Sequence, residues 1–359
     1  MAKYKLGEIC EIVSGSTPKT GIAEYWDGNL KWITPAEIDD ESYIITDSAR
    51  KLTKLGVKKT GLSSFPSGTV ILSSRAPIGK VAIAGCEMYC NQGFKNLICS
   101  DRINNRYLYW FLKGNTAYLN SLGRGATFKE ISKKIVSDIE INVPEISQQL
   151  AAVDALERVS EIIRLRKNQL QKLNELIKAR FVELFGDPLT NPKGYQEKYL
   201  SEIAEYWNGL TYKPDDVANE GTIVLRSSNI QNASLDFADT VRVNCKIGTK
   251  KYVQDNDILM CSRNGSAKLV GKVALIKELS EPMSFGAFMM IIRSAYYPFL
   301  MTYFQLPAFR SQITTGATTT INQITGRMLD NVKLAIPDIE SAKDFSAFTN
   351  QVDKSKVVA

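Results

Sequence analysis

The chain contains the same sequence pattern twice, with the second copy about 190 residues after the first. Leu6-Gly7-Glu8-Ile9 is matched by Leu200-Ser201-Glu202-Ile203, and Gly79-Lys80-Val81-Ala82-Ile83 is matched by Gly271-Lys272-Val273-Ala274-Leu275. The other matches, in the same order along the chain, are Leu72-Ser73-Ser74-Arg75 with Met260-Cys261-Ser262-Arg263, Gly125-Ala126-Thr127 with Gly316-Ala317-Thr318, and Ile139-Glu140-Ile141-Asn142-Val143-Pro144 with Val332-Lys333-Leu334-Ala335-Ile336-Pro337. The offset stays between 188 and 194 residues, so we expect a duplicated domain, and 359 residues are enough for two compact domains.

Each copy has the pattern of mixed helices and strands. Short runs rich in β-branched residues predict strands, and Pro77 and Gly79 between two of these runs predict a loop. Aromatic-rich segments predict helices. The expected strands are 70–73, 81–84, 139–143 and 332–336, and the expected helices are 105–112 and 298–306. We therefore predict an α+β fold class with two duplicated mixed α/β domains.

Between the copies, residues 147–185 contain no Gly or Pro and predict one long helix. Apolar residues recur along it at seven-residue spacing, which is typical of a coiled-coil seam. At about 1.5 Å per residue the helix is roughly 58 Å long, and Gly186 and Pro188 then end it. A helix with such an apolar side needs a partner helix. The residues expected to pack against that partner are Leu156, Ile163, Leu170, Leu173, Ile177 and Leu184.

These features divide the chain into four segments: a first domain at 1–145, a long spacer helix at 146–185, a second domain at 186–337 and a second helix at 338–359. In the second helix, Phe345, Phe348 and Val352 are spaced by three and four residues and predict an apolar side. Its last residue, Ala359, corresponds to Arg166 of the first helix. We therefore expect the second helix to be truncated by about twenty residues relative to the first.

The composition excludes several kinds of catalysis. The chain has no histidine, which removes Ser-His-Asp and Cys-His relays, His-assisted nucleases and zinc sites with a His ligand. Six unevenly placed cysteines predict neither a disulfide scaffold nor a metal site. The net charge of +7 suits an anionic partner without requiring one. No stretch approaches eighteen apolar residues and no signal-peptide pattern opens the chain, so we expect no membrane contact and a cytoplasmic location.

This layout resembles the specificity subunit of type I restriction-modification systems, and the resemblance covers essentially the whole chain. It rests on the paired openings at 6–18 and 200–214, the two Gly-Ala-Thr segments, and the junction Val-Pro-Glu-Ile-Ser-Gln-Gln at 143–149. The resemblance implies two target-recognition domains, each reading one half of a bipartite DNA sequence, and conserved long coiled-coil helices that pack antiparallel. It also implies a non-catalytic chain. Two methyltransferase subunits would bind its helices and methylate adenine at N6, and a restriction subunit would join them.

The resemblance also places the cofactors, S-adenosylmethionine, ATP and Mg²⁺, on those partner subunits and none on this chain. The sequence contains no Pro-Pro dipeptide, so the Asn/Asp-Pro-Pro-aromatic motif of adenine methyltransferases is missing. The pairs Gly79-Lys80 and Gly271-Lys272 lack the glycine-rich lead of a phosphate-binding P-loop. We expect a methyltransferase subunit or self-association to cover the apolar stripe around residues 170–184. Two alternatives stay open: a stand-alone Mg²⁺-dependent nuclease, and a coiled-coil adaptor without a DNA role.

Polar and basic side chains on the Gly- and Pro-marked loops are the candidate DNA contacts, with a solvated side chain as the alternative for each. Arg can bind guanine bidentately, and Asn or Gln can bind adenine. Arg75 and Arg263 occupy the same place in both copies. Residues that read bases should differ between copies that read different half-sites. The shared position therefore favours a common task such as phosphate binding or a structural salt bridge. The candidates are Ser14, Ser16, Thr17, Lys19, Arg75, Gln92, Lys95, Thr127 and Lys129 in the first copy, and Thr211, Lys213, Arg226, Asn229, Arg263, Asn264, Lys268, Thr318 and Asn322 in the second.

Overall fold

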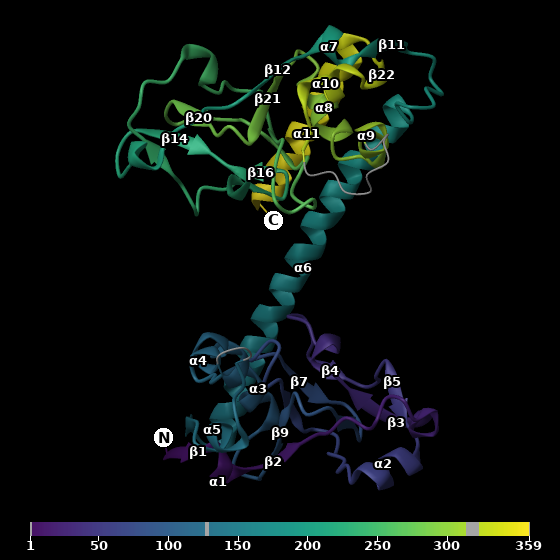
Figure 1. The fold of residues 1–359 in the computed structure, drawn as a ribbon, viewed down its shortest axis with the longest axis vertical. Coiled ribbons are helices and arrows are strands. Elements are labelled where there is room, and N and C mark those ends of the chain that lie inside the picture. Colours follow the sequence, from purple (N-terminus) through teal and green to yellow (C-terminus); the bar gives the residue numbers. More distant parts are fainter. Residues whose placement is uncertain (1, 126–128, 314–322, 359) are drawn as a thin grey trace. The chain divides into compact units, whose positions relative to one another are not determined.

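The structure is a computed structural model of the chain and describes residues 2–125, 129–313 and 323–358. The chain folds into two compact units, Met1–Arg164 and Leu165–Ala359. One 40-residue helix, α6 (Ile146–Phe185), contributes its first half to the first unit and its second half to the second (Figure 1). The prediction of one long helix over 147–185 is therefore confirmed, and the division between the units falls inside this helix.

The first unit is built on a five-stranded sheet with the order β2-β9-β6-β7-β4. Its inner strands β6 (Val70–Leu72) and β7 (Val81–Ala84) are entirely buried, which suits their β-branched composition. They pair antiparallel, with Val70 opposite Ile83, as the two runs and the Pro- and Gly-containing loop between them predict. The helix α3 (Asn105–Gly114) packs against both strands. The other strands of this sheet are β2 (Cys10–Ser14), β4 (Ile44–Ile45) and β9 (Lys95–Cys99).

Two smaller sheets complete the first unit. In the three-stranded sheet β5-β3-β8, the strands β3 (Trp26–Ile33) and β8 (Tyr89–Cys90) run parallel, and Ile33 lies opposite Cys90. The strand β1 (Ala2–Lys5) pairs with β10 (Glu140–Val143), so the start of the unit is joined to its last strand. The remaining elements are α1 (Leu6–Ile9), η1 (Ala23–Tyr25), η2 (Pro35–Glu37), β5 (Arg50–Leu52), α2 (Lys54–Thr60), α4 (Thr116–Ser121) and α5 (Lys133–Ser137).

The second unit repeats this topology. Its four-stranded sheet β12-β21-β18-β19 corresponds to β2-β9-β6-β7, its parallel pair β14-β20 corresponds to β3-β8, and its pair β11-β22 corresponds to β1-β10. The strand bounds are β11 (Gln196–Tyr199), β12 (Glu205–Asn208), β13 (Val217–Ala218), β14 (Thr222–Leu225), β15 (Ile230–Gln231), β16 (Ser234–Leu235), β17 (Arg242–Val243), β18 (Ile258–Cys261), β19 (Val273–Leu275), β20 (Met283–Phe285), β21 (Met289–Arg293) and β22 (Lys333–Ile336). The duplication predicted from the sequence is therefore visible in the strand order.

The aromatic-rich helix predicted over 298–306 is shorter than expected. The helix α8 (Tyr297–Tyr303) ends early, and α9 (Pro307–Ile313) begins a second helix at a proline. Proline suits a first helical position, because its missing N–H would be unpaired there in any case. The matching prediction over 105–112 is confirmed by α3. The remaining helical elements of the second unit are α7 (Leu200–Ile203), η3 (Pro214–Asp216), η4 (Ser227–Asn229), η5 (Thr249–Lys251), α10 (Gly326–Asp330) and α11 (Ile339–Val358).

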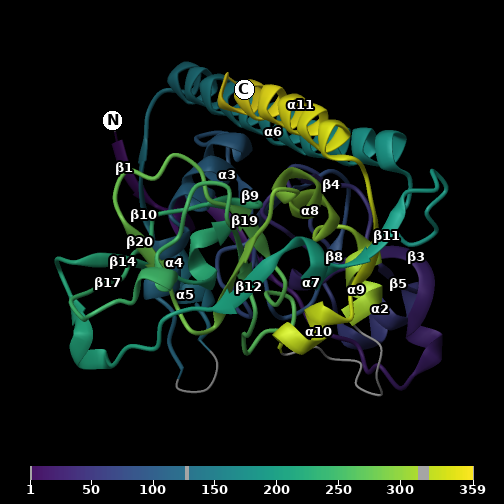
Figure 2. The ribbon, with the colours of Figure 1, turned by 90° about the horizontal axis from the view of Figure 1, so that it is seen from above.

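In the second unit, the C-terminal half of α6 packs antiparallel to α11. Phe181 and Phe185 of α6 both contact the buried ring of Phe345 in α11, and the Arg180 guanidinium lies over the ring of Phe348. Ile177, one turn earlier in α6, lines the same pocket as Asp353 and Lys356, which lie nearer the C-terminal end of α11. Figure 2 shows the two helices side by side. The antiparallel arrangement that the resemblance implies is therefore present.

The described part of the chain covers only some of the apolar side of α6. Ile177 and Leu184 pack against the core of the second unit, and Leu173 is half-buried. The expectation that a partner subunit or a second copy covers the stripe around residues 170–184 is therefore wrong for most of that stretch, because the second unit already covers it. Leu156, Ile163 and Leu170 are 42%, 51% and 37% exposed. Among the residues that the structure describes, no helix is long and apolar enough to cross a membrane.

Candidate nucleic-acid interface

In the first unit, three loops meet at the β8–β9 turn, which we define as residues 91–94. The opening loop after β2 reaches it at Ser16, whose backbone N–H donates to Cys90 O (3.0 Å). Asn91 N donates to Ile33 O at the end of β3 (3.1 Å), and Ser74 N, in the loop after β6, donates to Gly93 O (2.7 Å). The loops that carry Ser16, Thr17, Lys19, Arg75 and Gln92 are thus brought to one end of the parallel strand pair.

The second unit builds the same junction at its β20–β21 turn, residues 286–288. Leu210 N donates to Phe285 O (2.6 Å), Gly286 N to Leu225 O (2.9 Å) and Ser262 N to Phe288 O (3.0 Å). These bonds come from the corresponding loops after β12, β14 and β18. The two units therefore present equivalent loop clusters whose side chains differ.

The glycine near the start of each copy is explained by this junction. A Cβ at Gly15 would lie 2.0 Å from Cys90 O, and a Cβ at Gly209 would lie 2.1 Å from Phe285 O. Both distances are far below any van der Waals contact, so only glycine lets the opening loop approach the strand end this closely. The repeated glycines are a requirement of the backbone.

The candidate DNA contacts of the first unit differ in how accessible their side chains are to a ligand. Ser14, Lys19, Gln92 and Lys129 are exposed, whereas Ser16 and Thr17 are half-buried. Thr17 donates its hydroxyl hydrogen to Gln92, which joins the opening loop to the β8–β9 turn. Lys95 is only 7% exposed and contacts Ser74 and Glu130, which limits its reach toward a ligand. Thr127 lies outside the described residues.

In the second unit, Asn229 has a structural task. It is fully buried, its Oδ1 accepts from Arg226 N (2.8 Å), and its amide donates to the carbonyls of Asp236 and Asp239 (2.9 and 2.8 Å). In this conformation its side chain has no exposed atom for a base. The same backbone turn is closed in the first unit by Glu37, whose carboxylate accepts from Thr34 N (2.8 Å).

Arg226 donates to Asp239 (2.8 Å), and its buried Nε has no hydrogen-bond partner among the described residues. Asn264 donates to Ser227 Oγ (3.1 Å) and so links two of the loops. The candidates with exposed side chains are Thr211, Lys213, Arg263 and Lys268. Thr318 and Asn322 lie outside the described residues.

Three residues at these junctions were missed by the sequence reasoning. Glu130 pairs with both Arg75 (3.5 Å) and Lys95 (3.3 Å). Gln323 takes the place of Glu130 in the second unit, since Arg263 bridges to Gln323 as Arg75 bridges to Glu130. Phe288, 61% exposed, lies under the Arg263 guanidinium at 5.5 Å. The repeat offset aligns Glu130 with Gln323, so comparing the two copies could have identified this pair. No feature of the sequence around Phe288 indicated its role.

The thiol of Cys90 at the first junction is not an activated nucleophile. Burial raises the pKa of the Cys90 thiol to about 12 and so keeps the thiol protonated. A hydrogen bond from Asn96 lowers this pKa, but the effect of burial is larger. Within the described parts of the chain, no group of three or more Cys, Asp or Glu side chains is placed to hold a metal ion.

The sequence profile of the type I restriction modification DNA specificity domain matches residues 1–175 and again residues 192–357. The chain belongs to this family. The type I specificity domain is thus present twice, once for each of the two equivalent loop clusters.

Two named relatives and one solved structure are similar to this chain over different shares of its length. The type I restriction enzyme MjaIX specificity subunit of Methanocaldococcus jannaschii is 36% identical, over 57% of this chain and about half (52%) of the relative. The MjaVIII specificity subunit of the same organism is 21% identical, over 97% of this chain and 85% of the relative. The crystal structure of the type I S subunit from M. genitalium shares the fold, with a TM-score of 0.55 and 14% identity, over 99% of this chain and 90% of that chain.

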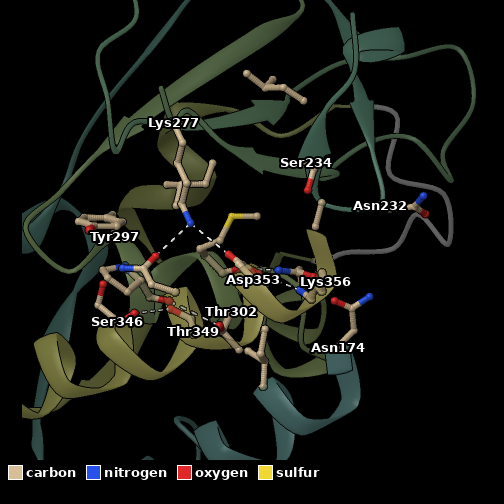
Figure 3. A pocket seen from close by; sticks show the side chains of 18 of the residues that line it. Asn174, Asn232, Ser234, Lys277, Tyr297, Thr302, Ser346, Thr349, Asp353 and Lys356 are labelled. Atoms are coloured by element: carbon tan, nitrogen blue, oxygen red, sulfur yellow. Dashed lines mark hydrogen bonds and ion pairs between the residues drawn. The ribbon is translucent and has the colours of Figure 1, made fainter. Parts of the chain in front are cut away.

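A pocket of about 560 Å³ in the second unit of this specificity-family chain lies away from the loop junction. It is bounded by α6, α8, α11 and the β15-β16 pair. On its wall, Lys277 donates to Asn350 (3.2 Å) and Asp353 (3.1 Å), and Lys356 also pairs with Asp353 (2.9 Å) (Figure 3). These bonds anchor α11 to the segment that follows β19.

Proposed function

We propose that this chain is the DNA-reading subunit of a type I restriction-modification complex, and that each unit reads one half of a two-part DNA target. One observation carries the proposal: the family domain occurs twice, and each copy builds the same junction of loops after corresponding strands. An equivalent backbone with different side chains is suited to reading two different half-sites.

The side chains at the junctions support contact with DNA. Exposed Lys19, Lys129, Lys213, Arg263 and Lys268 can neutralise phosphates, and the exposed amide of Gln92 suits a base edge. Phosphate contacts make binding fall steeply with salt concentration. The mild net charge of +7 indicates that such contacts supplement base reading and do not supply all of the affinity.

The exposed apolar residues of α6 support docking of partner subunits. Val159, Ile162 and Ile163 are each more than half exposed, and Leu156 and Leu170 continue the stripe on either side. Large apolar side chains in one exposed patch mark sites of protein association. We propose that methyltransferase subunits, two per chain, cover this stripe, and that a restriction subunit joins the assembly in the cytoplasm.

In this proposal the chain is non-catalytic. Partner subunits bind S-adenosylmethionine for adenine N6 methylation and ATP with Mg²⁺ for restriction. This chain supplies the address on DNA and the helices that hold the partners.

The test is a reconstitution. Purified chain, purified methyltransferase subunit and their mixture are each incubated with DNA and labelled S-adenosylmethionine. The proposal predicts methyl transfer only by the mixture, together with salt-dependent DNA binding. Methyl transfer by the chain alone, Mg²⁺-dependent cleavage by the chain alone, or a mixture that does not bind DNA would each contradict it.

A further inference from the structure

Arg75 and Arg263 lie in the same backbone frame but in different electrostatic surroundings. In the first unit, Arg75 forms a backbone bridge with Glu130, and Ile131 N donates to Ser74 O (3.0 Å). In the second unit, Arg263 forms the same bridge with Gln323, and Ile324 N donates to Ser262 O (2.7 Å). A carboxylate in one unit is thus replaced by a neutral amide in the other.

In the first unit, the Glu130 carboxylate holds two cations. One oxygen is 3.5 Å from Arg75 Nη1, and the other is 3.3 Å from Lys95 Nζ. The Lys95 side chain is only 9% exposed, whereas those of Arg75 and Glu130 are about one-third exposed. A buried ammonium needs a counter-charge, so Glu130 is required as long as Lys95 is present.

The second unit lacks both members of the Lys95–Glu130 pair. Ser73 is bridged to Phe94 in the first unit and Cys261 pairs with Met289 in the second, so the next residues, Lys95 and Met290, are equivalent. Met290 is buried and apolar, and Gln323 is exposed. The exposed Arg263 guanidinium lies over the ring of Phe288. The aromatic ring carries no net charge, so this contact does not neutralise the guanidinium as a carboxylate would.

We propose that Glu130 is a built-in counter-ion that restrains Arg75, and that Arg263 is therefore the arginine that makes the stronger contact with DNA phosphates. This inference rests on the proposed function. A phosphate that approaches Arg75 must compete with a carboxylate already in place, whereas one that approaches Arg263 meets only a neutral amide at the equivalent position. The two units then bind DNA with unequal shares of backbone affinity.

The test measures DNA affinity of the reconstituted complex with the methyltransferase subunits, at several salt concentrations. We expect Arg263→Ala to weaken binding about tenfold and to lower the salt slope by about one, as loss of one phosphate contact does. We expect Arg75→Ala to weaken binding less than about threefold. Equal costs for the two substitutions would overturn the inference.

A swap variant removes the restraint without leaving a buried charge unpaired. Lys95→Met with Glu130→Gln gives the first unit the chemistry of the second, and thermal unfolding shows whether the unit folds. In this background the loss of DNA affinity caused by Arg75→Ala should rise to about tenfold. The reverse swap, Met290→Lys with Gln323→Glu, should reduce the loss caused by Arg263→Ala.

An unchanged effect of Arg75→Ala in the folded swap variant would overturn the inference. If the swap variant does not fold, the comparison of the two single arginine variants decides alone. A wild-type complex without salt-dependent binding would overturn the proposed function as well, which separates the two failures.

Discussion

Phe185 near the end of α6 and Phe345 in α11 pack edge to face, with ring centroids 5.4 Å apart and both side chains buried. Phe181 and Phe299 join the same aromatic cluster. The contact ties the helix that follows the first copy to the helix that follows the second. It therefore makes the spacer helix part of the folded core of the second unit.

Phe345→Ala should destabilise the second unit by about 3–5 kcal/mol, the usual cost of removing a buried aromatic side chain. Phe348→Ala on the same helix is the matched control, because Phe348 is only partly buried, and its cost should be about 1 kcal/mol. Urea unfolding of the free chain, followed by tryptophan fluorescence and circular dichroism, measures both. Similar costs for the two variants would show that the cluster does not hold α11 in place.

Ile163→Asp should weaken binding of a methyltransferase subunit at least tenfold, because it places a charge in the exposed apolar stripe of α6. The stability of the free chain should change by less than about 0.5 kcal/mol, since this side chain is 51% exposed. Asn168→Asp puts the same charge about 140° around the helix and is the control. Sedimentation of the mixed subunits gives the affinity, and equal effects of both variants would exclude the stripe as the docking face.

Gly15→Ala should displace the opening loop of the first unit, because the added methyl group would meet Cys90 O. We expect a loss of about 1–3 kcal/mol in stability and a loss of DNA affinity of at least tenfold in the complex. Gly21→Ala is a matched control in the same loop, since nothing lies within 4 Å of its added Cβ. An intact DNA affinity in the Gly15→Ala variant would remove the opening loop from the interface.

The ion pairs of Asp353 should stabilise the folded chain near neutral pH, and this contribution should be lost in acid. Burial disfavours the ionised carboxyl, but hydrogen bonds from Lys356 and Lys277 outweigh this and hold the pKa of Asp353 below its ordinary value. A lowered folded pKa adds stability that is fully present above the unfolded value of about 3.9 and is lost as the pH falls through the folded value. The Asp353 side chain is 42% exposed, so solvent screening limits the effect to less than about 1 kcal/mol.

Asp353→Asn should therefore lower stability at pH 6, and this deficit should shrink as the pH falls toward 2. Asp344→Asn, an exposed position on the same helix, is the control and should change little at either pH. Denaturant titrations at both pH values give the difference. A constant deficit of the Asp353→Asn variant at both pH values would contradict the assignment.

The strands and helices that the sequence predicts are those with a local signal. Each of these signals lies in one continuous stretch of sequence. They are the apolar run of β6, the aromatic residues of α3 and the seven-residue spacing in α6. The end of α8 was misplaced because Pro307 starts a new helix within a continuous aromatic segment. The duplication of the domain was predicted from the constant offset between the two copies, because no single helix or strand indicates it.

The candidate site was predictable at the level of loops but not of side chains. The burial of Lys95 depends on Glu130, 35 residues later in the chain, and the burial of Asn229 depends on the carbonyls of Asp236 and Asp239. Both arrangements arise from tertiary packing, which periodicity does not report. A polar residue on a loop therefore marked the region correctly, while its hydrogen-bond partners decided whether it faces the core or a ligand.

The central claim is that each unit reads one half of a two-part DNA target for a partner methyltransferase. Its most direct test is to map N6-methyladenine in a random-sequence DNA library treated with the reconstituted complex. A parallel experiment replaces residues 192–337 with the corresponding segment of a relative. We predict a motif of two short sequences separated by unread bases, of which the chimera changes only one. A continuous motif, a chimera that changes both halves, or methylation that is the same without this chain would contradict the claim.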